Sequence, residues 1–372
     1  MPGAYTGTVV VVGGGIVAAS VAYHLARQAV AVTVITGSQI GTATDAGAGI
    51  VCPWTDRLDD AAYQLAADGA RYYPELLAAL ADDGESDTGY ANVGALCVAA
   101  DPADLSATAA LLRSRLPVSP EISEVTELDP PEPSRMFPPL AESLSGLWVP
   151  GGARIDGRKI RDSLIRAAIR RGARQVHGSA VLDHVGGDRS AGVTVRDKRI
   201  DADVVVVAAG AWTAQICVSL GWNLAIGPQR GQILHVEVPD ADTASWPVVL
   251  PSGDPYLLSF PAGRVVLGAT REEAGFDYRA TVGGISGLLT AALELAPGLR
   301  GATMLETRIG FRPTTRDGLP LLGRLGENLI IAAGNGAEGL TAGVWTGRMA
   351  ALLAMDQQPV TDLSPFDPMR FG

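Results

Sequence analysis

The alternation of apolar and polar segments predicts a β-α-β unit at the start of the chain. Residues 8–12 are a short run of mostly β-branched residues that ends in three consecutive glycines. Residues 16–28 are mostly good helix formers with apolar side chains at helical spacing, and 30–36 form a second apolar run that stops at Gly37. Short, continuously apolar strands joined by a helix are typical of a buried parallel sheet.

The rest of the pattern predicts strands of two kinds. Buried, mainly apolar strands are expected at 203–209 and 328–333, each followed by a glycine. Antiparallel strands are expected at 232–238, 256–260 and 264–268. Helices are expected at 59–81, 158–171, 282–295 and 344–355. The segment 117–139 is rich in proline and acidic residues and is expected to be a surface connection.

The order of these segments predicts an α/β fold in which a second domain, in two pieces, interrupts one nucleotide-binding domain. Parallel-type strands fall at the start, middle and end of the chain, with antiparallel segments between them. We expect the nucleotide-binding domain to comprise 1–83, 151–220 and 309–372. The substrate domain is then expected to comprise 84–150 and 221–308.

The composition of the chain excludes a largely disordered protein and argues against several kinds of partner and site. Of the 372 residues 47% are hydrophobic, which excludes a largely disordered chain, and a net charge of −11 argues against nucleic acid or an anionic membrane as partner. The most apolar segments, 8–17 and 204–211, are about half the roughly 20 residues that cross a bilayer. No basic stretch precedes the first apolar run, and three widely spaced cysteines suit neither a disulfide framework nor a CxxC metal site. We therefore expect a soluble, cytoplasmic protein without a metal.

The turn after the first strand has the spacing of a phosphate-binding loop. Residues 13–18 read G-G-G-I-V-A, which fits G-x-G-x-x-[GA] between a strand and a helix. Gly13 permits the tight turn, Gly15 lets the backbone approach a pyrophosphate, and Ala18 allows close helix packing. The N–H groups and positive dipole end of the helix would then face the phosphates. The motif favours a bound dinucleotide, and the alternative is a glycine-rich turn without a ligand.

This motif lacks the usual acidic partner of the ribose. An Asp or Glu is expected about 20 residues after the loop. Thr36 holds that position, and no acidic residue occurs between Ala18 and Thr44. No arginine follows the strand to pair with the 2′-phosphate of NADP. Thr36 can still bond a ribose hydroxyl through a weaker, neutral contact.

Five segments resemble the D-amino-acid-oxidase-like family of FAD enzymes, in the same order and spacing over nearly the whole chain. They are the small-residue loop 42–51, the segment 152–156 before a helix, the strand and turn 203–212, the segment 310–323 and the loop 334–341. The fourth contains G-F-R-P followed by D-G-L-P-L-L-G. The chain is most similar to glycine oxidases and to D-amino acid and sarcosine oxidases and dehydrogenases.

The resemblance implies a Rossmann-like FAD-binding domain of the glutathione-reductase type with an inserted antiparallel-sheet α+β substrate domain. It implies non-covalent FAD, because Gly310 stands where some members have a flavin-linking cysteine. Backbone N–H groups of 339–341 would stabilise the negative charge of reduced flavin, and the backbone of Val181 would meet the adenine. The cofactor-binding residues so expected are Gly13, Gly15, Ile16, Val17, Thr36, Thr44, Asp45, Ala48, Gly49, Ile50, Val181, Gly210, Trp212, Gly334, Asn335, Gly336, Gly339, Leu340 and Thr341.

Two residues are candidates for binding a substrate carboxylate. Arg312 matches the family's carboxylate-binding arginine, and its planar guanidinium suits a carboxylate. The alternative for this side chain is a structural ion pair with Asp317 or Glu306. Tyr256 matches a tyrosine that points into the pocket of glycine-oxidase-like relatives, and its alternative is an ordinary core residue.

A third candidate, Glu338, lies where the family pattern departs from this chain. Glycine oxidases carry a second arginine in the loop before the last helix, but this chain has Ala337 followed by Glu338. Glu338 either attracts the ammonium group of the substrate or faces solvent.

The resemblance implies FAD-dependent oxidation of the C–N bond of a small amino acid: a D-amino acid, glycine or an N-methyl amino acid. Hydride transfer to flavin N5 would give an imine that hydrolyses to the keto acid, and no side chain is needed as a catalytic base. Alternatives are a dehydrogenase that uses a quinone or carrier instead of O2, and a non-catalytic flavin-binding subunit for electron relay. The C-terminal segments disfavour an NAD-dependent dehydrogenase. A homo-oligomer stays open.

Overall fold

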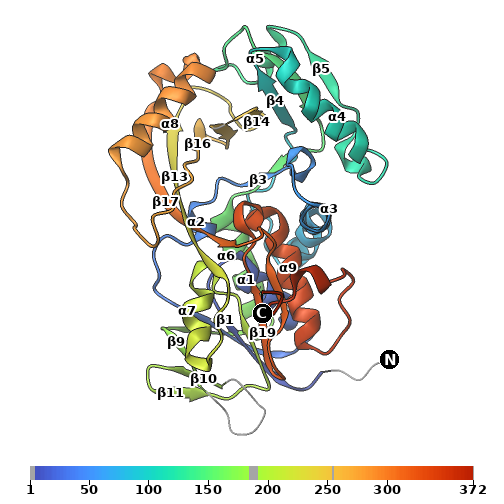
Figure 1. Cartoon of the computed structure of the whole chain (residues 1–372), viewed down its shortest axis with the longest axis vertical. Helices are drawn as coiled ribbons and strands as arrows, with labels where there is room; N and C mark the ends of the chain where they lie inside the picture. Colours follow the sequence, from blue (N-terminus) through green and yellow to red (C-terminus); the bar gives the residue numbers. More distant parts are fainter. Residues whose placement is uncertain (1–4, 184–191, 254, 372) are drawn as a thin grey trace.

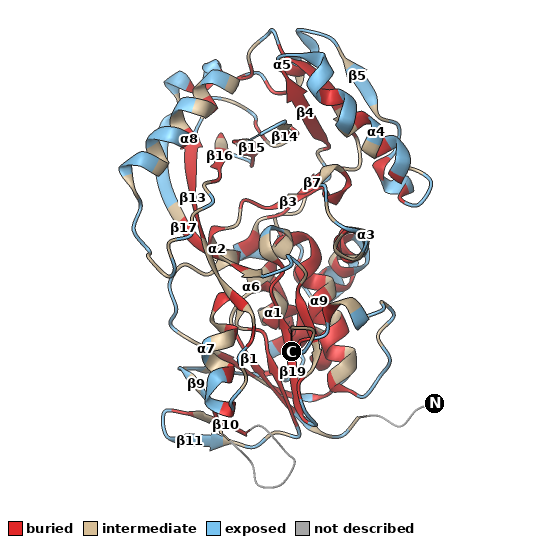
Figure 2. Cartoon of the chain, in the orientation of Figure 1, coloured by how far each residue is buried: buried red, intermediate tan, exposed pale blue. Residues whose placement is uncertain are grey.

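The computed structural model describes residues 5–183, 192–253 and 255–371, and the structural statements below concern those residues. Their strands form two large sheets and two small ones. Figure 1 shows one large sheet in each half of the molecule. Buried residues concentrate in the strands and in the central helices α1 (Ile16–Arg27) and α9 (Gly339–Ala354), whereas the outer helices of the upper half are largely exposed (Figure 2).

The first large sheet has six strands in the order β18-β19-β12-β1-β2-β8. They are β1 (Thr8–Val12), β2 (Ala31–Thr36), β8 (Arg174–His177), β12 (Val204–Val207), β18 (Leu321–Arg324) and β19 (Leu329–Ala333). All neighbours run parallel except β18 and β19. With β1 inside the sheet and crossovers to both sides, this is the arrangement of a nucleotide-binding sheet.

Packing on both faces explains why these strands read as continuous apolar runs. Val9 and Val11 pack towards α1, α6 (Gly157–Arg170) and α9. Val10 and Val12 pack towards α7 (Thr213–Cys217) and a three-stranded sheet on the other side. That small sheet consists of β9 (Ala180–Asp183), β10 (Gly192–Val195) and β11 (Lys198–Ile200). Since successive strand residues point to opposite faces, a strand covered on both sides is apolar throughout.

The second large sheet has eight strands in the order β17-β13-β16-β15-β14-β4-β6-β5. They are β4 (Ala95–Ala99), β5 (Thr126–Leu128), β6 (Ser145–Val149), β13 (Ile226–Glu237), β14 (Val248–Pro251), β15 (Tyr256–Ser259), β16 (Arg264–Gly268) and β17 (Thr303–Thr315). Its neighbours are antiparallel except β14 and β4. The α/β prediction, with an antiparallel sheet inserted, is confirmed, and the five-segment domain division remains a proposal.

The remaining elements connect or cover these sheets. The helices are α2 (Ala43–Ala46), α3 (Asp60–Asp82), α4 (Ser106–Arg115), α5 (Glu132–Met136) and α8 (Val282–Leu295), and β3 (Ile50–Val51) pairs with β7 (Ala153–Arg154). Helix α8 covers one face of the antiparallel sheet, through Leu288 and Ala292. In the described part of the chain, no helix combines the length and the apolar character that a membrane crossing requires.

Several expected elements differ from the structure. The segment 117–139 is more than a surface connection: it contains β5 and α5, and Ile122 and Phe137 are fully buried. The pattern also misses β4, β6, α4 and the long β17, whose first residues are mostly exposed and so carry no apolar signal. Helix α9 begins at Gly339, not at residue 344 as expected, which places its N-terminus at the cavity described below.

Close backbone approach fixes the position of α9. A Cβ atom on Gly347 would lie 2.5 Å from Cβ of Ser20 on α1, and one on Gly69 of α3 would lie 2.3 Å from the carbonyl oxygen of Thr341. The hydroxyl of Ser20 donates to the carbonyl oxygen of Val344 at 2.6 Å. Small residues therefore let α1, α3 and α9 pack backbone to backbone.

We predict that Gly347→Ala lowers the free energy of unfolding by about 1–3 kcal/mol, because the added methyl group overpacks the contact with α1. Gly287→Ala on α8 is the matched control. A Cβ at Gly287 meets nothing within 4 Å, so this change should stabilise the helix by about 0.5–1 kcal/mol. Denaturant unfolding measures both. Equal effects of the two substitutions would contradict the close packing of α9.

Candidate active site

A continuous cavity of about 790 Å³ lies where the carboxyl ends of the parallel strands meet one face of the antiparallel sheet. We call it the central cavity. Its parallel-sheet side is formed by the glycine loop after β1 and by the ends of β2, β12 and β19. Its other side is formed by β13, β15 and β17. Crevices at the carboxyl ends of parallel strands are the usual ligand sites of such sheets.

The glycine loop has the close approach that its sequence predicts. Gly13 has φ +146°, and a Cβ atom there would lie 2.2 Å from the carbonyl oxygen of Ala208. The first helical N–H group, on Ile16, donates to Oγ1 of Thr44 at 3.0 Å. This N–H is therefore not free for a phosphate as expected, but the Thr44 hydroxyl keeps its own proton to donate in its place.

Thr36 lies at the end of β2 and lines the same cavity, as its candidate role requires. Its Oγ1 accepts a hydrogen bond from Nε2 of Gln175 on β8 at 3.2 Å. A Cβ atom on Gly14 would lie 2.6 Å from Cγ2 of Thr36, so the strand end and the glycine loop are in contact. The ribose contact of Thr36 remains a prediction.

The small-residue loop 42–51 forms another side of the cavity. The hydroxyl of Thr42 donates to the carboxylate of Asp45 at 2.6 Å, and Arg161 on α6 binds the other carboxylate oxygen. Asp45 therefore has a structural task even though it lines the cavity. Gly49 has φ +102°, and a Cβ there would lie 1.8 Å from the carbonyl oxygen of Ile155.

The loop 334–341 ends at the N-terminus of α9, and all its residues line the cavity. The Asn335 side chain donates to the hydroxyl of Thr346 at 2.8 Å, and the Thr341 hydroxyl donates to the carbonyl oxygen of Ile50 at 3.1 Å. Tyr73 of α3 donates to the carbonyl oxygen of Leu340. These bonds hold the helix start, with its positive dipole end, at the cavity.

Two other cofactor candidates, Trp212 and Val181, differ in whether they line the cavity. Trp212 lines the cavity and packs edge-to-face on Phe311, with ring centroids 6.0 Å apart. Val181 is 51% exposed and does not line the cavity, which at this point is formed by residues 178–180. The adenine contact of the Val181 backbone remains a prediction. The other expected cofactor residues, Val17, Ala48 and Gly210 among them, line the cavity.

Arg312 and Tyr256 reach the cavity across glycines of the antiparallel sheet. A Cβ atom on Gly231 of β13 would lie 2.7 Å from Nη1 of Arg312 on β17. A Cβ atom on Gly268 of β16 would lie 2.5 Å from the hydroxyl of Tyr256 on β15. Each of the neighbouring strands β13 and β16 thus has a glycine where the adjacent strand, β17 or β15, places its long side chain. Tyr256 is half-buried and lines the cavity, so it is not simply a core residue.

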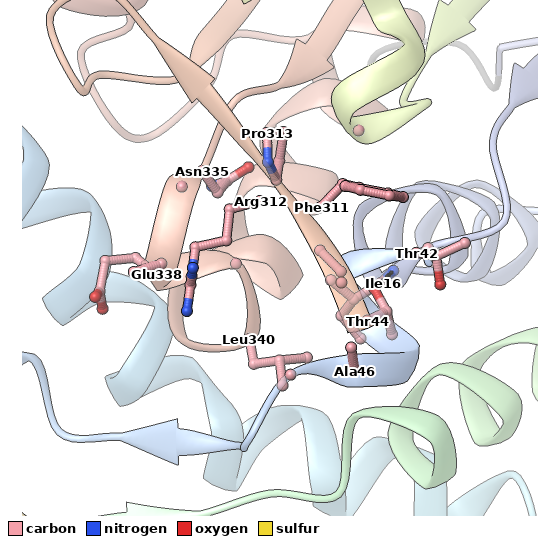
Figure 3. A pocket seen from close by; sticks show the side chains of 18 of the residues that line it. Ile16, Thr42, Thr44, Ala46, Phe311, Arg312, Pro313, Asn335, Glu338 and Leu340 are labelled. Carbon is pink, nitrogen blue, oxygen red and sulfur yellow. Dashed lines mark hydrogen bonds between the residues drawn. The ribbon is translucent and has the colours of Figure 1, made fainter. Parts of the chain in front are cut away.

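The acids considered as structural partners of Arg312 are bound elsewhere. Asp317 accepts hydrogen bonds from Arg370 at 2.8 and 2.9 Å, and Glu306 accepts one from Nε of Arg308 at 2.9 Å. The Nη1 atom of Arg312 donates to the carbonyl oxygen of Thr270 at 3.0 Å. That bond holds one end of the guanidinium, and Figure 3 shows the Arg312 side chain among the residues that line the cavity.

Glu338 lines the cavity together with an acid that the sequence pattern does not single out, Asp56. In Figure 3 the side chains of Arg312 and Glu338 extend in the same direction. Burial raises the pKa of Glu338, and the negative charge of Asp56 raises it further. Burial also raises the pKa of Asp56, while Arg115 and Arg271 oppose that shift. Glu338 is half-buried at the cavity, so both of its alternatives stay open.

Cys52 and Cys97 also line the cavity, whereas the sequence places no cysteine near the segment around Gly310. Burial raises the pKa of Cys97 to about 12 and that of Cys52 well above its ordinary value. Such thiols are scarcely ionised at neutral pH, which makes them poor nucleophiles. At Gly310 itself an added Cβ would lie 2.6 Å from Cβ of Ala46.

Cys52 and Asp56 come from one segment, whereas Cys97 and Arg271 lie far along the chain, and none belongs to a spaced motif. Only their convergence on one cavity identifies them. No group of three or more His, Cys, Asp or Glu side chains suited to a metal ion occurs among the described residues.

Comparison with known proteins identifies the family. A family model described as "FAD dependent oxidoreductase" (DAO) matches residues 8–353. The chain belongs to this family. It is 45% identical over 364 residues to the uncharacterized oxidoreductase YurR of Bacillus subtilis (strain 168), a match that covers 96% of this chain and 98% of that protein.

Solved structures agree with this DAO assignment. The iminodiacetate oxidase (IdaA) of Chelativorans sp. BNC1 is 43% identical with a TM-score of 0.94, over 97% of this chain and 98% of that chain. The glycine oxidase of Geobacillus kaustophilus is 27% identical with a TM-score of 0.85, over 98% and 99%. The expected family, the FAD cofactor and the enzyme class, an oxidoreductase of the amino-acid-oxidase type, are confirmed.

The described residues fit FAD in this DAO-family site. At Gly13 and Gly49 an added side chain would collide with neighbouring protein backbone. Glycine therefore allows these two loops to pack tightly where they line the cavity. Backbone N–H groups at the start of α9 supply positive potential without a cationic side chain. When bound, FAD supplies the two-electron acceptor, and the protein supplies binding and orientation.

We predict that acid precipitation releases all FAD into the supernatant, because neither cavity thiol ionises readily. The Cys52→Ser/Cys97→Ser double variant is the control and should release the same fraction. Absorbance of the supernatant and of the redissolved pellet measures it. A wild-type pellet that stays yellow, beside a colourless pellet from the double variant, would contradict non-covalent binding.

Proposed function

We propose that this DAO-family enzyme oxidises the C–N bond of a small amino acid to an imine, which water hydrolyses to the keto acid. The observation that carries the proposal is the position of Arg312, whose guanidinium lies over Gly231 inside the central cavity. A planar cation there can hold the substrate carboxylate through two parallel hydrogen bonds. The Tyr256 hydroxyl lines the same cavity from β15, three strands along the sheet, and can donate a second contact. Bound FAD would supply the hydride acceptor, N5.

The substrate class follows from the chemistry of the cavity and from the relatives. A D-amino acid, glycine or an N-substituted glycine presents one carboxylate to Arg312 and one amine. Relatives named glycine oxidase and iminodiacetate oxidase make glycine and iminodiacetate the first substrates to test. The three cysteines are free, which supports a reducing, cytoplasmic location.

Two other functions compete with an oxidase. A dehydrogenase would use the same cavity but pass electrons to a quinone or carrier. A non-catalytic electron-relay subunit would need FAD but no carboxylate-binding arginine, so Arg312 and Tyr256 disfavour it. O2 is the proposed acceptor because the two relatives above are named oxidases.

The central test is substitution of Arg312. Arg312→Ala should lower kcat/KM for the amino acid by the equivalent of about 2–5 kcal/mol, and Arg312→Lys by less, because Lys keeps the charge but not the planar fork. Anaerobic flavin reduction should slow as well, because the α-hydrogen is misoriented. The readout is the preference for the amino acid over the matching amine without a carboxylate. A flavin-loaded Ala variant that keeps the wild-type preference would refute the assignment.

A second substitution tests how Arg312 is placed without removing it. Gly231→Ala should raise KM, because the new methyl group displaces the flexible guanidinium end. Gly227→Ala, on the same strand, is the matched control because a Cβ there meets nothing within 4 Å. In an Arg312→Ala background, Gly231→Ala should have no further effect on KM. Additive effects of the two substitutions would show that Gly231 acts by another route.

A further inference from the structure

We propose that Asp56 and Glu338 together form the site that recognises the substrate's ammonium group and takes up its proton before oxidation. The inference rests on the proposed function, since it supplies the amine end of the same substrate. Both carboxylates line the cavity that contains Arg312 and Tyr256. A cavity that presents cations to a carboxylate and anions to an ammonium matches the two ends of a zwitterionic amino acid.

Both acids are held by rigid backbone. Asp56 ends a turn in which Nη1 of Arg115 donates to the carbonyl oxygens of Trp54 and Asp56, each at 2.8 Å. Glu338 precedes α9, and its N–H donates to the carbonyl oxygen of Asn335 at 2.9 Å. Neither of these bonds uses a carboxylate oxygen, so they fix the backbone of both acids without engaging their carboxylates.

The groups around the pair set its charge. Arg271, at the exposed rim of the cavity, acts on both acids, and Arg115 acts on Asp56. The Thr341 hydroxyl lies beside Glu338. Cys52 and Cys97 also face the acids, and as neutral thiols they add no charge. Arg312 and Tyr256 line the same cavity from the sheet side.

In the central cavity Asp56 and Glu338 lose both of their protons less readily than two free carboxyl groups would. Burial raises the pKa of both acids, and the negative charge of Asp56 further disfavours ionisation of Glu338. A pair that retains one proton carries a single negative charge. That charge complements one ammonium group.

The proton step has a simple balance. An amino acid arrives mainly with its amine protonated, and that nitrogen then has no lone pair to form the C=N bond. One N–H proton moves to a carboxylate oxygen of the pair, which frees the lone pair. The C–H bond at the α-carbon then breaks, its electron pair leaves as hydride to the oxidised cofactor, and the nitrogen lone pair forms the C=N bond.

The binding test compares iminodiacetate with diglycolate, in which an ether oxygen replaces the amine between the same two carboxylates. Wild-type enzyme should bind iminodiacetate more tightly. Glu338→Gln and Asp56→Asn should each reduce this discrimination by about 10- to 100-fold, since a charge-assisted hydrogen bond is lost. Diglycolate binding should be unchanged or tighter. The dissociation constants come from flavin absorbance for diglycolate and from anaerobic stopped-flow reduction for iminodiacetate.

The pH dependence tests proton uptake separately. In the Asp56→Asn/Glu338→Gln double variant only the neutral amine can react. The midpoint of the pH profile of flavin reduction should therefore follow the amine pKa of each substrate across glycine, N-methylglycine and iminodiacetate. In wild type the midpoint should be the same for all three. Glu327→Gln, an exposed acid outside the cavity, is the control and should behave like wild type.

The outcomes separate this inference from the proposed function. If no amino acid reduces the wild-type flavin, the proposed function fails, and the inference fails with it. If reduction occurs and depends on Arg312, but the acid variants keep wild-type discrimination and pH profiles, only the amine site is refuted. Equal loss of affinity for both ligands would assign Asp56 and Glu338 a purely structural role and would also refute it.

Discussion

The antiparallel pairing of β13 with β17 is the interaction on which the active-site geometry depends. It runs without interruption from Ile226 opposite Thr315 to His235 opposite Glu306 and, after a register shift, on to Glu237 opposite Thr303. At the nucleotide-binding end, Phe311 of β17 donates from its N–H to the carbonyl oxygen of Gly41 at 2.9 Å. The same strand presents Arg312 one residue later. One ladder therefore joins the segment that leads into the small-residue loop of the cavity to the sheet that carries Arg312.

Missing side chains are as important to this site as the side chains that are present. Glycines at 231 and 268 leave room on the inner strands, and Arg312 and Tyr256 occupy it. The loop after β1 also depends on a missing side chain, since Gly13 packs directly on the backbone of Ala208, the residue after β12. Arg312, Asp56 and Glu338 then line one cavity, where partial burial strengthens each charged interaction with a ligand. We propose that such a cavity favours zwitterions over simple amines or simple acids.

The sequence predicts the parts of this structure that depend on local pattern. The glycine loop, the buried strands around Val10 and Val205, and the helix over residues 282–295 follow from periodicity and turn chemistry. The sequence could also suggest Arg312, because its motif is continuous. It could not suggest Asp56 or Gly231, because their significance arises from neighbours far along the chain. The sequence pattern did not predict the exposed half of β17 or the short β5. These segments form strands because they pair with neighbouring strands, and their residues show no apolar periodicity.

The central proposal is that this cavity binds the carboxylate and the amine of one amino acid beside the flavin. The most direct measurement is anaerobic titration of the FAD-loaded enzyme with glycine, N-methylglycine, iminodiacetate, and paired D- and L-amino acids, each beside its amine without the carboxylate. The account predicts loss of the oxidised-flavin absorbance with at least one amino acid and not with its decarboxylated partner, and recovery when air is admitted. Equal reduction by the amino acid and by the amine, or no reduction by any amino acid, would contradict it.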